Sequence, residues 1–398
     1  MDFGSFGKQY KGEDIISRMP DDVLSHIISR LEAKDAFKTC VLSTRWKNVW
    51  TLIYNLCFRD GYGGNSGTMF VNFVEFVLHR CQSNNIQNFH LRTGYELQES
   101  DADRLTDLIC FAVDARNVSS LTLKFNVEGE NPMISNSLQK LFRSCPTLEE
   151  LKIKGWHDIG GNVLTFDITK PTLKKLKIDL SATVCSVLGE TPFLNKVILD
   201  GKVDRRLLHG ESLTKPVSEF FRAINSTRFL RLDIKIMSVL SRDLYGNLPS
   251  FPNLIYLHLG IGVFIGYALM VQFLNNSPNL EVLVLDKEDA DSYRWDDIVL
   301  FEFELECVPS CMLLHLKEIY IFIGEDKNLQ DLEVIKRLLG NSIVLERFSV
   351  NFYLSFGEHL QGLQDAILSY PMVSPICKID FSDDRCWNTL WSKFYKYR

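Results

Sequence analysis

The sequence lacks the patterns that mark the active site of an enzyme. No Gly-x-Ser-x-Gly motif, Walker phosphate loop or dinucleotide-binding glycine motif occurs in the 398 residues, and the eight histidines are dispersed. Cys307 with Cys311, and Cys377 with Cys386, lack the further Cys or His ligands of a tetrahedral zinc site. We therefore expect no catalytic residues, no metal and no cofactor.

Two other features are scarce: paired cysteines and an excess of positive charge. The ten cysteines are scattered singly in apolar segments, and the first twenty residues contain no apolar segment typical of a signal peptide. We expect reduced, mostly buried thiols in a protein of the nucleus or cytoplasm that is not secreted. With 44 basic and 50 acidic residues, the net charge of −6 predicts no general attraction to nucleic acid or to an anionic membrane.

Charged residues are absent from Gly246 to Leu280, and Leu254 to Leu274 is long enough to span a bilayer. His258 lies inside this run and Pro278 follows it, which argues against a membrane helix. The repeat spacing described below divides the run into a strand and a helix of a soluble repeat. The sequence therefore predicts no membrane segment.

Residues 14–53 have the pattern of a compact set of short helices. Pro20 followed by two aspartates favours a helix start, and the apolar residues that follow repeat at helical spacing. Forty residues with this much apolar surface cannot bury all of it internally. From composition alone, the remainder could be covered by a partner or by the rest of the chain.

The same segment resembles the F-box of plant F-box proteins. The matching stretches are Met19-Pro20-Asp21-Asp22-Val23-Leu24 and Val41-Leu42-Ser43-Thr44-Arg45-Trp46-Lys47-Asn48-Val49-Trp50. The resemblance implies docking on the Skp-type linker protein of a cullin–RING ubiquitin ligase. The residues expected to make that contact are Met19, Pro20, Val23, Leu24, Ile27, Leu31, Val41, Leu42, Trp46 and Trp50.

A triplet of apolar residues, spaced three and then two apart, recurs ten times, about 29 residues apart on average. Several copies begin with a proline two residues before the first apolar position, as in Cys145-Pro146-Thr147-Leu148. The copies are Ile86/Phe89/Leu91, Val118/Leu121/Leu123, Leu148/Leu151/Ile153, Leu173/Leu176/Ile178, Leu194/Val197/Leu199, Phe229/Leu232/Ile234, Leu254/Leu257/Leu259, Leu280/Leu283/Leu285, Leu316/Ile319/Ile321 and Leu345/Phe348/Val350.

This periodicity predicts a divergent leucine-rich-repeat solenoid, in which each copy gives one short parallel strand and a returning helix or loop. We therefore expect an α/β protein: a short N-terminal helical F-box module, then a solenoid with parallel strands on the concave side and helices and loops outside. Unrelated strands in a β-sandwich are the alternative, but a sandwich does not explain why a proline and three apolar residues recur at the same spacing.

The expected domain organisation follows from these patterns. Residues 307–352 contain Cys307-Val308-Pro309-Ser310-Cys311, Leu332-Glu333-Val334-Ile335-Lys336-Arg337-Leu338-Leu339 and Leu345-Glu346-Arg347-Phe348. With these stretches the segment resembles the FBD region found at the end of many plant F-box/leucine-rich-repeat chains. The aromatic stripe Trp387, Leu390, Trp391 and Phe394 indicates either a cap on the last repeat or a partner-binding helix. The expected segments are a disordered 1–13, the F-box at 14–53, a connector and first array helix at 54–85 that includes the glycine-rich 61–67, repeats at 86–306, FBD-like repeats at 307–352 and a helical cap at 353–398.

The strand period of two also predicts which side chains face a bound target. Outward positions of the early copies are mostly basic, and those of later copies are aromatic or apolar. This change suits a ligand with an acidic or phosphorylated part beside an apolar one, although the lysines could equally be ordinary solvated charges. The candidate target-binding residues are Lys152, Lys175, Lys177, Arg231, Tyr256, His258 and Tyr320.

Taken together, the resemblance implies a non-catalytic subunit of a Skp–cullin–F-box ubiquitin ligase. The F-box would hold the linker and the array an unknown target protein, so that ubiquitin transfer depends on proximity. The alternative is a non-catalytic scaffold that uses the same surfaces without directing ubiquitination.

Overall fold

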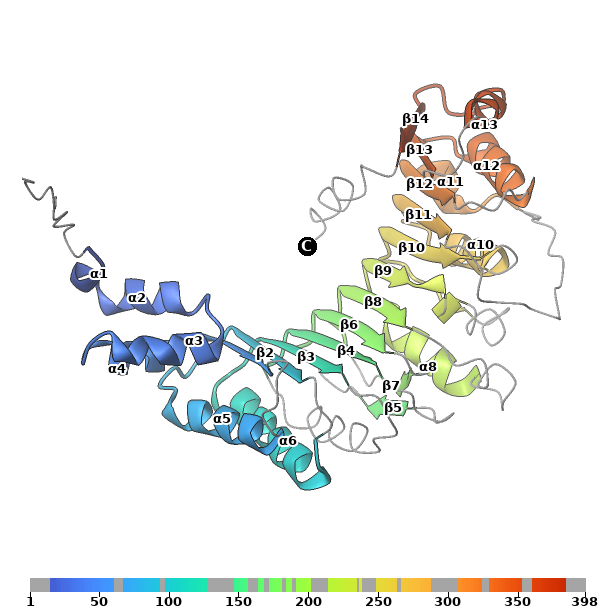
Figure 1. Ribbon diagram of the computed structural model, residues 1–398. Coiled ribbons are helices and arrows are strands. Elements are labelled where there is room, and N and C mark those ends of the chain that lie inside the picture. The colour runs from blue at the N-terminus through green and yellow to red at the C-terminus, as the bar shows by residue number, and fades with distance from the viewer. Residues whose placement is uncertain are drawn as a thin grey trace, which may run out of the picture.

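The computed structural model describes residues 15–60, 67–93, 97–126, 147–156, 164–167, 172–180, 184–187, 191–201, 214–234, 236–237, 248–262, 266–287, 307–323, 329–352 and 360–383. A small helical module at one end leads directly into a curved parallel sheet (Figure 1). Strands line the inner side of the curve and helices lie along its outer side. The predicted fold, a helical module followed by a solenoid with strands inside and helices outside, is confirmed.

The helical module consists of short helices that pack around a small core. Pro20 precedes α2, and its carbonyl accepts hydrogen bonds from the backbone N–H groups of Val23 and Leu24, each at 3.1 Å. Asp21 and Asp22 lie in the first turn, where the helix dipole favours negative charge. The elements are α1 (Ile15–Arg18), α2 (Asp21–Ile28), α3 (Ala33–Lys38), η1 (Thr39–Val41), α4 (Trp46–Val49) and η2 (Trp50–Leu52).

The main sheet has twelve strands in the described part of the chain, and neighbouring strands all pair in parallel. In spatial order these are β1 (Asn55–Arg59), β2 (Asn88–Thr93), β3 (Ser120–Asn126), β4 (Glu150–Trp156), β6 (Lys175–Leu180), β8 (Lys196–Gly201), β9 (Phe229–Leu232), β10 (Tyr256–Ile261), β11 (Val282–Lys287), β12 (Glu318–Ile323), β13 (Arg347–Phe352) and β14 (Lys378–Asp383). Strands β5 (Leu164–Asp167) and β7 (Val184–Val187) form a separate two-stranded sheet.

The outer helices return the chain between strands. They are α5 (Gly67–Arg80), α6 (Glu99–Ala115), α8 (Thr214–Ala223), α10 (Tyr267–Asn276), α11 (Ser310–Leu314), α12 (Leu329–Asn341) and α13 (Leu360–Leu368). Strand register aligns the apolar triplets in rows, so that Leu257, Leu283 and Ile319 face the helices side by side, each fully buried. Stacking of these rows makes one continuous core along the array.

The turns before the strands also connect neighbouring repeats. The Thr172 hydroxyl, which follows Pro171 in the sequence, donates a 2.9 Å hydrogen bond to the carbonyl of Leu148 in the preceding repeat. Ser374 donates in the same way to the carbonyl of Leu345 at 2.6 Å. A hydroxyl side chain next to a proline, Pro171 or Pro375 in the sequence, therefore donates to a backbone carbonyl of the preceding repeat.

The array extends one strand further at each end than the ten predicted copies. β1 lies in the segment predicted as a connector, and β14 lies in the segment predicted as a helical cap. Both strands carry the same spacing, as Ile53/Leu56/Phe58 and Ile376/Ile379/Phe381. The glycine-rich segment consequently joins β1 to α5 within the array and does not separate the module from it.

One predicted copy has the wrong phase. Leu230 and Leu232 of β9 align with the core residues of β10, whereas Phe229 aligns with Tyr256 on the opposite face of the sheet. Thr227, fully buried, takes the first position of this copy, where the other copies have an apolar residue. Because Thr227 is polar, the apolar spacing predicts Phe229, Leu232 and Ile234 for this copy, whereas the structure places Thr227, Leu230 and Leu232 at these positions.

The uncharged run from Leu254 to Leu274 forms a strand and a helix, β10 and α10, as its spacing predicts. Among the residues that the structure describes, no helix has the length and apolar character needed to cross a bilayer.

A buried polar cluster ties three repeats together in the second half of the array. The Lys287 ammonium at the end of β11 donates to the carboxylate of Asp331 on α12, and the Tyr267 hydroxyl of α10 donates to the same carboxylate. Lys287 and Asp331 are 4% and 5% exposed, so the pair is shielded from water. Burial and the adjacent Asp331 raise the pKa of Tyr267 well above its usual value.

Cysteine burial matches the prediction only in part. Of the seven cysteines whose side chains the structure describes, Cys81 and Cys311 are buried, four are half-buried and Cys307 is exposed; all seven are free thiols. The Cys311 thiol donates to the carbonyl of Leu274 at 3.3 Å, and burial raises its pKa to about 12. The described residues contain no group of three side chains that could hold a metal ion. The predicted disordered residues 1–13 and the stripe from Trp387 to Phe394 lie outside the described ranges.

Candidate functional site

The helical module presents a row of apolar side chains to solvent. Five of the residues expected to contact the linker are between 40% and 83% exposed. Val23, Ile27 and Leu31 follow one another at helical spacing from α2, and Val41 and Leu42 lie at the end of η1. We call Val23, Ile27, Leu31, Val41 and Leu42 the F-box face. Exposed apolar groups gathered in so small a module are typical of a protein-binding surface.

Three of the residues expected at the linker lie inside the module instead. Leu24, Trp46 and Trp50 are 0%, 7% and 3% exposed, so they belong to the core of the module. Pro20 is exposed and Met19 is half-buried, and both remain candidates for the contact. The apolar residues of α2 identify an amphipathic helix, but the sequence does not show that Leu24 is buried while its neighbour Val23 is exposed.

An arginine holds the segment after η1 against the start of α2. The Arg45 Nε donates a 2.7 Å hydrogen bond to Asp21 Oδ1, and its guanidinium also donates to the carbonyl of Met19. Arg45 and Asp21 are separated by 24 residues, so this contact fixes the module's tertiary arrangement. The clamp brings the two parts of the F-box face into one module.

Aromatic side chains fasten the module to the array. The Phe37 ring of α3 makes edge-on contacts with Trp50 and with Phe76 of α5, at centroid distances of 5.2 and 5.4 Å. Trp50 and Phe76 stack at 6.1 Å. The core residues of the module and of the first strands belong to one cluster. The module is therefore seated on the array and not tethered to it by a flexible linker.

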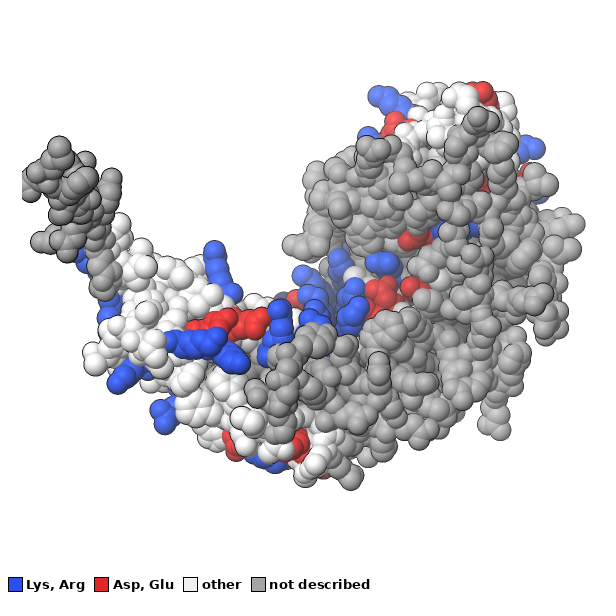
Figure 2. Space-filling view, viewed as in Figure 1, with Lys and Arg blue, Asp and Glu red and all other residues white. Residues whose placement is uncertain are grey.

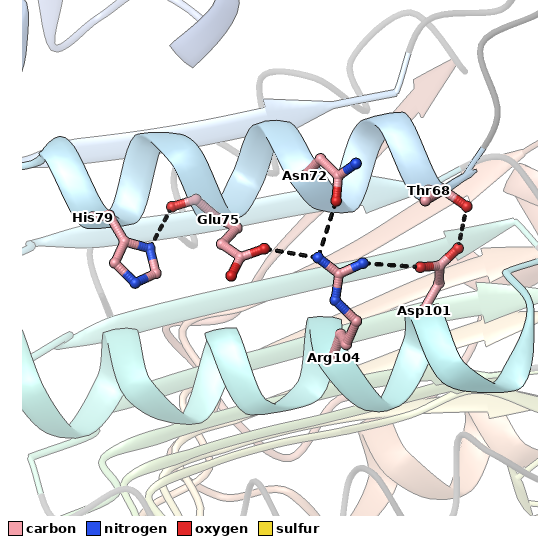
Figure 3. A network of polar contacts seen from close by, with 6 residues as sticks. All are labelled: Thr68, Asn72, Glu75, His79, Asp101 and Arg104. Atoms are coloured by element: carbon pink, nitrogen blue, oxygen red, sulfur yellow. Dashed lines mark hydrogen bonds and ion pairs between the residues drawn. The ribbon is translucent and has the colours of Figure 1, made fainter.

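The helix that carries Phe76 is itself locked to its neighbour by a polar network (Figure 3). The Arg104 guanidinium of α6 donates to Asn72 Oδ1 at 2.9 Å and to Glu75 Oε2 at 2.7 Å, both on α5. Asp101 of α6 accepts from the same guanidinium at 3.4 Å and from the Thr68 hydroxyl. This network fixes α5, and through Phe76 it fixes the module.

The basic residues predicted to face a target do lie on the inner face, where most of them pair with acids. Lys152 lies 2.9 Å from Glu150, and Lys177 lies 3.1 Å from Asp200. Arg231 lies 3.5 Å from the other oxygen of Asp200. Lys175 is half-buried on the same face. From β4 to β9 the inner face is therefore a mixed lattice of charges.

The predicted aromatic part of the target site is not accessible. Tyr256, His258 and Tyr320 lie on the inner face by register, but they are 0%, 3% and 2% exposed. Large rings on adjacent strands pack against one another there: the Phe229 and Tyr256 rings stack at 4.3 Å, with the Lys196 ammonium 4.2 Å from the Phe229 centroid. Strand periodicity predicts the face of a side chain correctly but not its exposure.

The buried imidazole in this region faces a carboxylate. His258 Nε2 lies 3.4 Å from Asp286 Oδ2 on the next strand. Burial lowers the pKa of His258, and the nearby Asp286 opposes this effect without cancelling it. At neutral pH the imidazole is therefore uncharged. It is packed inside the array and is not accessible to a ligand.

The first three strands carry cations on the inner face; the strand period of two predicts Arg92 and Lys124 as outward residues, but it does not predict Arg59. Arg59, Arg92 and Lys124 share one register position on the inner face of the neighbouring strands β1, β2 and β3. Arg59 was missed because β1 itself was assigned to the connector. Leu56 and Phe58 carry the spacing of the other copies, and this spacing would have predicted Arg59 as an outward residue.

Comparison with known proteins identifies the N-terminal module and relates most of the chain to plant proteins. The family model described as the F-box domain matches residues 16–58. An FBD-associated F-box protein of Arabidopsis thaliana is 24% identical over 85% of this chain and 95% of its own length. An F-box/LRR-repeat protein of Arabidopsis thaliana is 22% identical over 92% of this chain and 97% of its own length. Another F-box/LRR-repeat protein of that plant is 27% identical over 75% of this chain and 98% of its own length.

These relatives span the module and most of the array together. Residues 16–58 are thus an F-box domain, and the resemblance of this chain to plant F-box/leucine-rich-repeat proteins of the FBD type is confirmed over most of its length.

Proposed function

We propose that this chain is the substrate-recognition subunit of a Skp–cullin–F-box ubiquitin ligase. The F-box domain and the names of the relatives support an adaptor role in ubiquitin ligase complexes generally. The finer proposal is that the F-box face binds a Skp-type linker protein and that the inner face of the array binds the protein to be ubiquitinated.

The observation that carries this proposal is the exposure of the F-box face. Burying five aliphatic side chains removes apolar surface from water, which stabilises a complex by roughly 25 cal/mol for each Å² buried. Val41 and Leu42, at 83% and 64% exposed, are the best candidates for residues that dominate the binding energy.

The chain would position the target protein and would not itself catalyse ubiquitin transfer. The F-box domain is packed on the first repeats through Phe37, Trp50 and Phe76, so a target bound to the array is held at a defined distance from the linker. Such positioning raises the effective concentration of target lysines at the ubiquitin-conjugating enzyme. The free thiols described above support a reducing compartment, the nucleus or cytoplasm.

A reconstituted conjugation assay tests this proposal. We expect no conjugates when the chain is mixed with ubiquitin, activating enzyme and conjugating enzyme, and conjugates once the linker, cullin and RING subunits are supplied. Val41→Asp with Leu42→Asp should abolish the reaction, because carboxylates would be buried in an apolar interface. The matched control is Leu314→Asp with Ile343→Asp, which alters two exposed aliphatic residues of the array and should leave conjugation unchanged.

Two outcomes would overturn the proposal. Conjugation by the chain alone, with a thioester on one of its cysteines, would make it an enzyme. Linker binding without conjugation in the complete mixture would favour the non-catalytic scaffold.

A further inference from the structure

Four cations occupy one row across the first four strands of the inner face. Register pairs Arg59 with Arg92, Arg92 with Lys124, and Lys124 with Lys154. Adjacent strands are about 4.8 Å apart, so the row extends over about 14 Å. We call Arg59, Arg92, Lys124 and Lys154 the cationic row. Figure 2 shows basic side chains gathered on the hollowed inner side of the molecule.

Acidic residues close the row at its two ends. Arg59 lies 2.9 Å from Glu32 of the F-box domain, and Lys154 lies 2.6 Å from Asp179, which continues the row on β6. Between these ends, no carboxylate of the described residues lies within ion-pair distance of Lys124. The centre of the row is therefore positive in a chain whose net charge is −6.

This arrangement is unfavourable for the isolated chain. Like charges directly opposite one another on neighbouring strands destabilise a sheet. The pKa of Lys124 is lowered by burial and by the adjacent Arg92, Lys154 and Arg59. His90, two residues before Arg92 on β2, has its pKa lowered by burial and by Lys124, Arg59 and Arg92, and its buried Nε2 makes no hydrogen bond among the described residues. A bound anion would relieve these interactions.

We propose that the cationic row binds an acidic, extended segment of the protein that the array captures. This inference rests on the proposed role of the array in target capture and gives that target a chemical property, a run of Asp and Glu residues. About four residues of extended chain cover the row, at roughly 3.3 Å per residue. The carboxylates of such a segment would be paired by Arg92 and Lys124 at its centre.

The geometry favours carboxylates of a peptide over other anions. The cations stand in single file, one on each strand, which suits single charges spaced along a chain; a phosphate group suits cations that converge on one point. A nucleic acid strand would extend past Glu32 and Asp179 at the two ends of the row, where its phosphates would meet carboxylates.

Fluorescence anisotropy of a labelled peptide of alternating Asp and Glu tests the proposal on the full chain. We expect binding that weakens when salt rises from about 50 to about 200 mM, because screening reduces these interactions. The peptide with Asn and Gln in place of the acids should not bind. Arg92→Gln with Lys124→Gln should weaken binding about tenfold or more.

The matched control removes the same charge from the outer helices. Arg222 of α8 and Lys336 of α12 are exposed, and Arg222→Gln with Lys336→Gln should leave peptide affinity unchanged. Lys124→Gln alone should weaken binding without lowering the thermal midpoint, because it relieves repulsion in the free chain. A residue that only stabilised the sheet would behave in the opposite way.

Three results would overturn the proposal: affinity unchanged in the Arg92/Lys124 variant, affinity lowered equally in the control variant, or tighter binding of a phosphorylated peptide or single-stranded RNA than of the acidic peptide. Linker capture is measured on the same samples. If linker capture persists while peptide binding fails, only this inference is wrong. If peptide binding holds and linker capture fails, only the proposed ligase role is wrong.

Discussion

The F-box domain and the middle of the repeat array use apolar side chains in opposite ways. Every residue of β10 and β11 is buried, on both faces of the sheet. The F-box face instead leaves Val41 and Leu42 mostly in water. Apolar side chains in the array therefore stabilise the fold, whereas those of the F-box face contribute little to folding and are available for association.

The largest expected effect is the difference between two Leu→Ala substitutions, one in the array and one in the F-box face. Leu283→Ala in β11 removes a fully buried side chain and should lower the free energy of unfolding by about 3 kcal/mol. Leu42→Ala removes the same atoms from a side chain that is 64% exposed and should change it by less than about 0.5 kcal/mol. Urea denaturation of the two variants measures both effects. Similar losses in the two variants would mean that the F-box face belongs to the folding core.

Lowering the pH should have a smaller effect on stability, and this effect comes from a buried residue of the array. Burial lowers the pKa of His258, so at acidic pH the unfolded chain binds a proton more readily than the folded chain. Stability therefore falls as the pH drops below about 6.5, by at most about 1.4 kcal/mol per pH unit for this one group. His258→Gln should reduce the loss of stability between pH about 7.5 and about 5.5, as measured by denaturation. An equal loss in both proteins would show that His258 does not set this part of the pH dependence.

Much of the fold follows from local patterns in the sequence. The triplet spacing predicted nine of the ten copies in the correct phase, because each strand buries the residues that the spacing selects. It failed at β9, where Thr227 replaces an apolar residue and Phe229 packs on the inner face. β1 and β14 carry the same spacing, but they lie in segments that the sequence predicts as a connector and a helical cap.

Exposure was harder to predict than position. The F-box resemblance pointed to Leu24 and Trp50, which are buried, as well as to Val23, which is exposed, since sequence agreement does not distinguish buried from exposed residues. On the inner face, the period of two placed Tyr256 correctly but could not show that Phe229 stacks against it. Exposure depends on contacts between side chains of neighbouring repeats, which are far apart in the sequence and cannot be read from it directly.

The central claim is that the F-box face exists for binding and not for folding. The most direct test is a calorimetric titration of a Skp-type linker protein into the full chain and into its Val41→Ala, Leu42→Ala variant, with urea denaturation of both. We expect linker affinity to fall at least about tenfold, because two side chains at the centre of an interface are truncated, while the unfolding midpoint stays unchanged. Unchanged affinity in a folded variant would contradict the claim, as would a loss of affinity that is matched by an equal loss of stability.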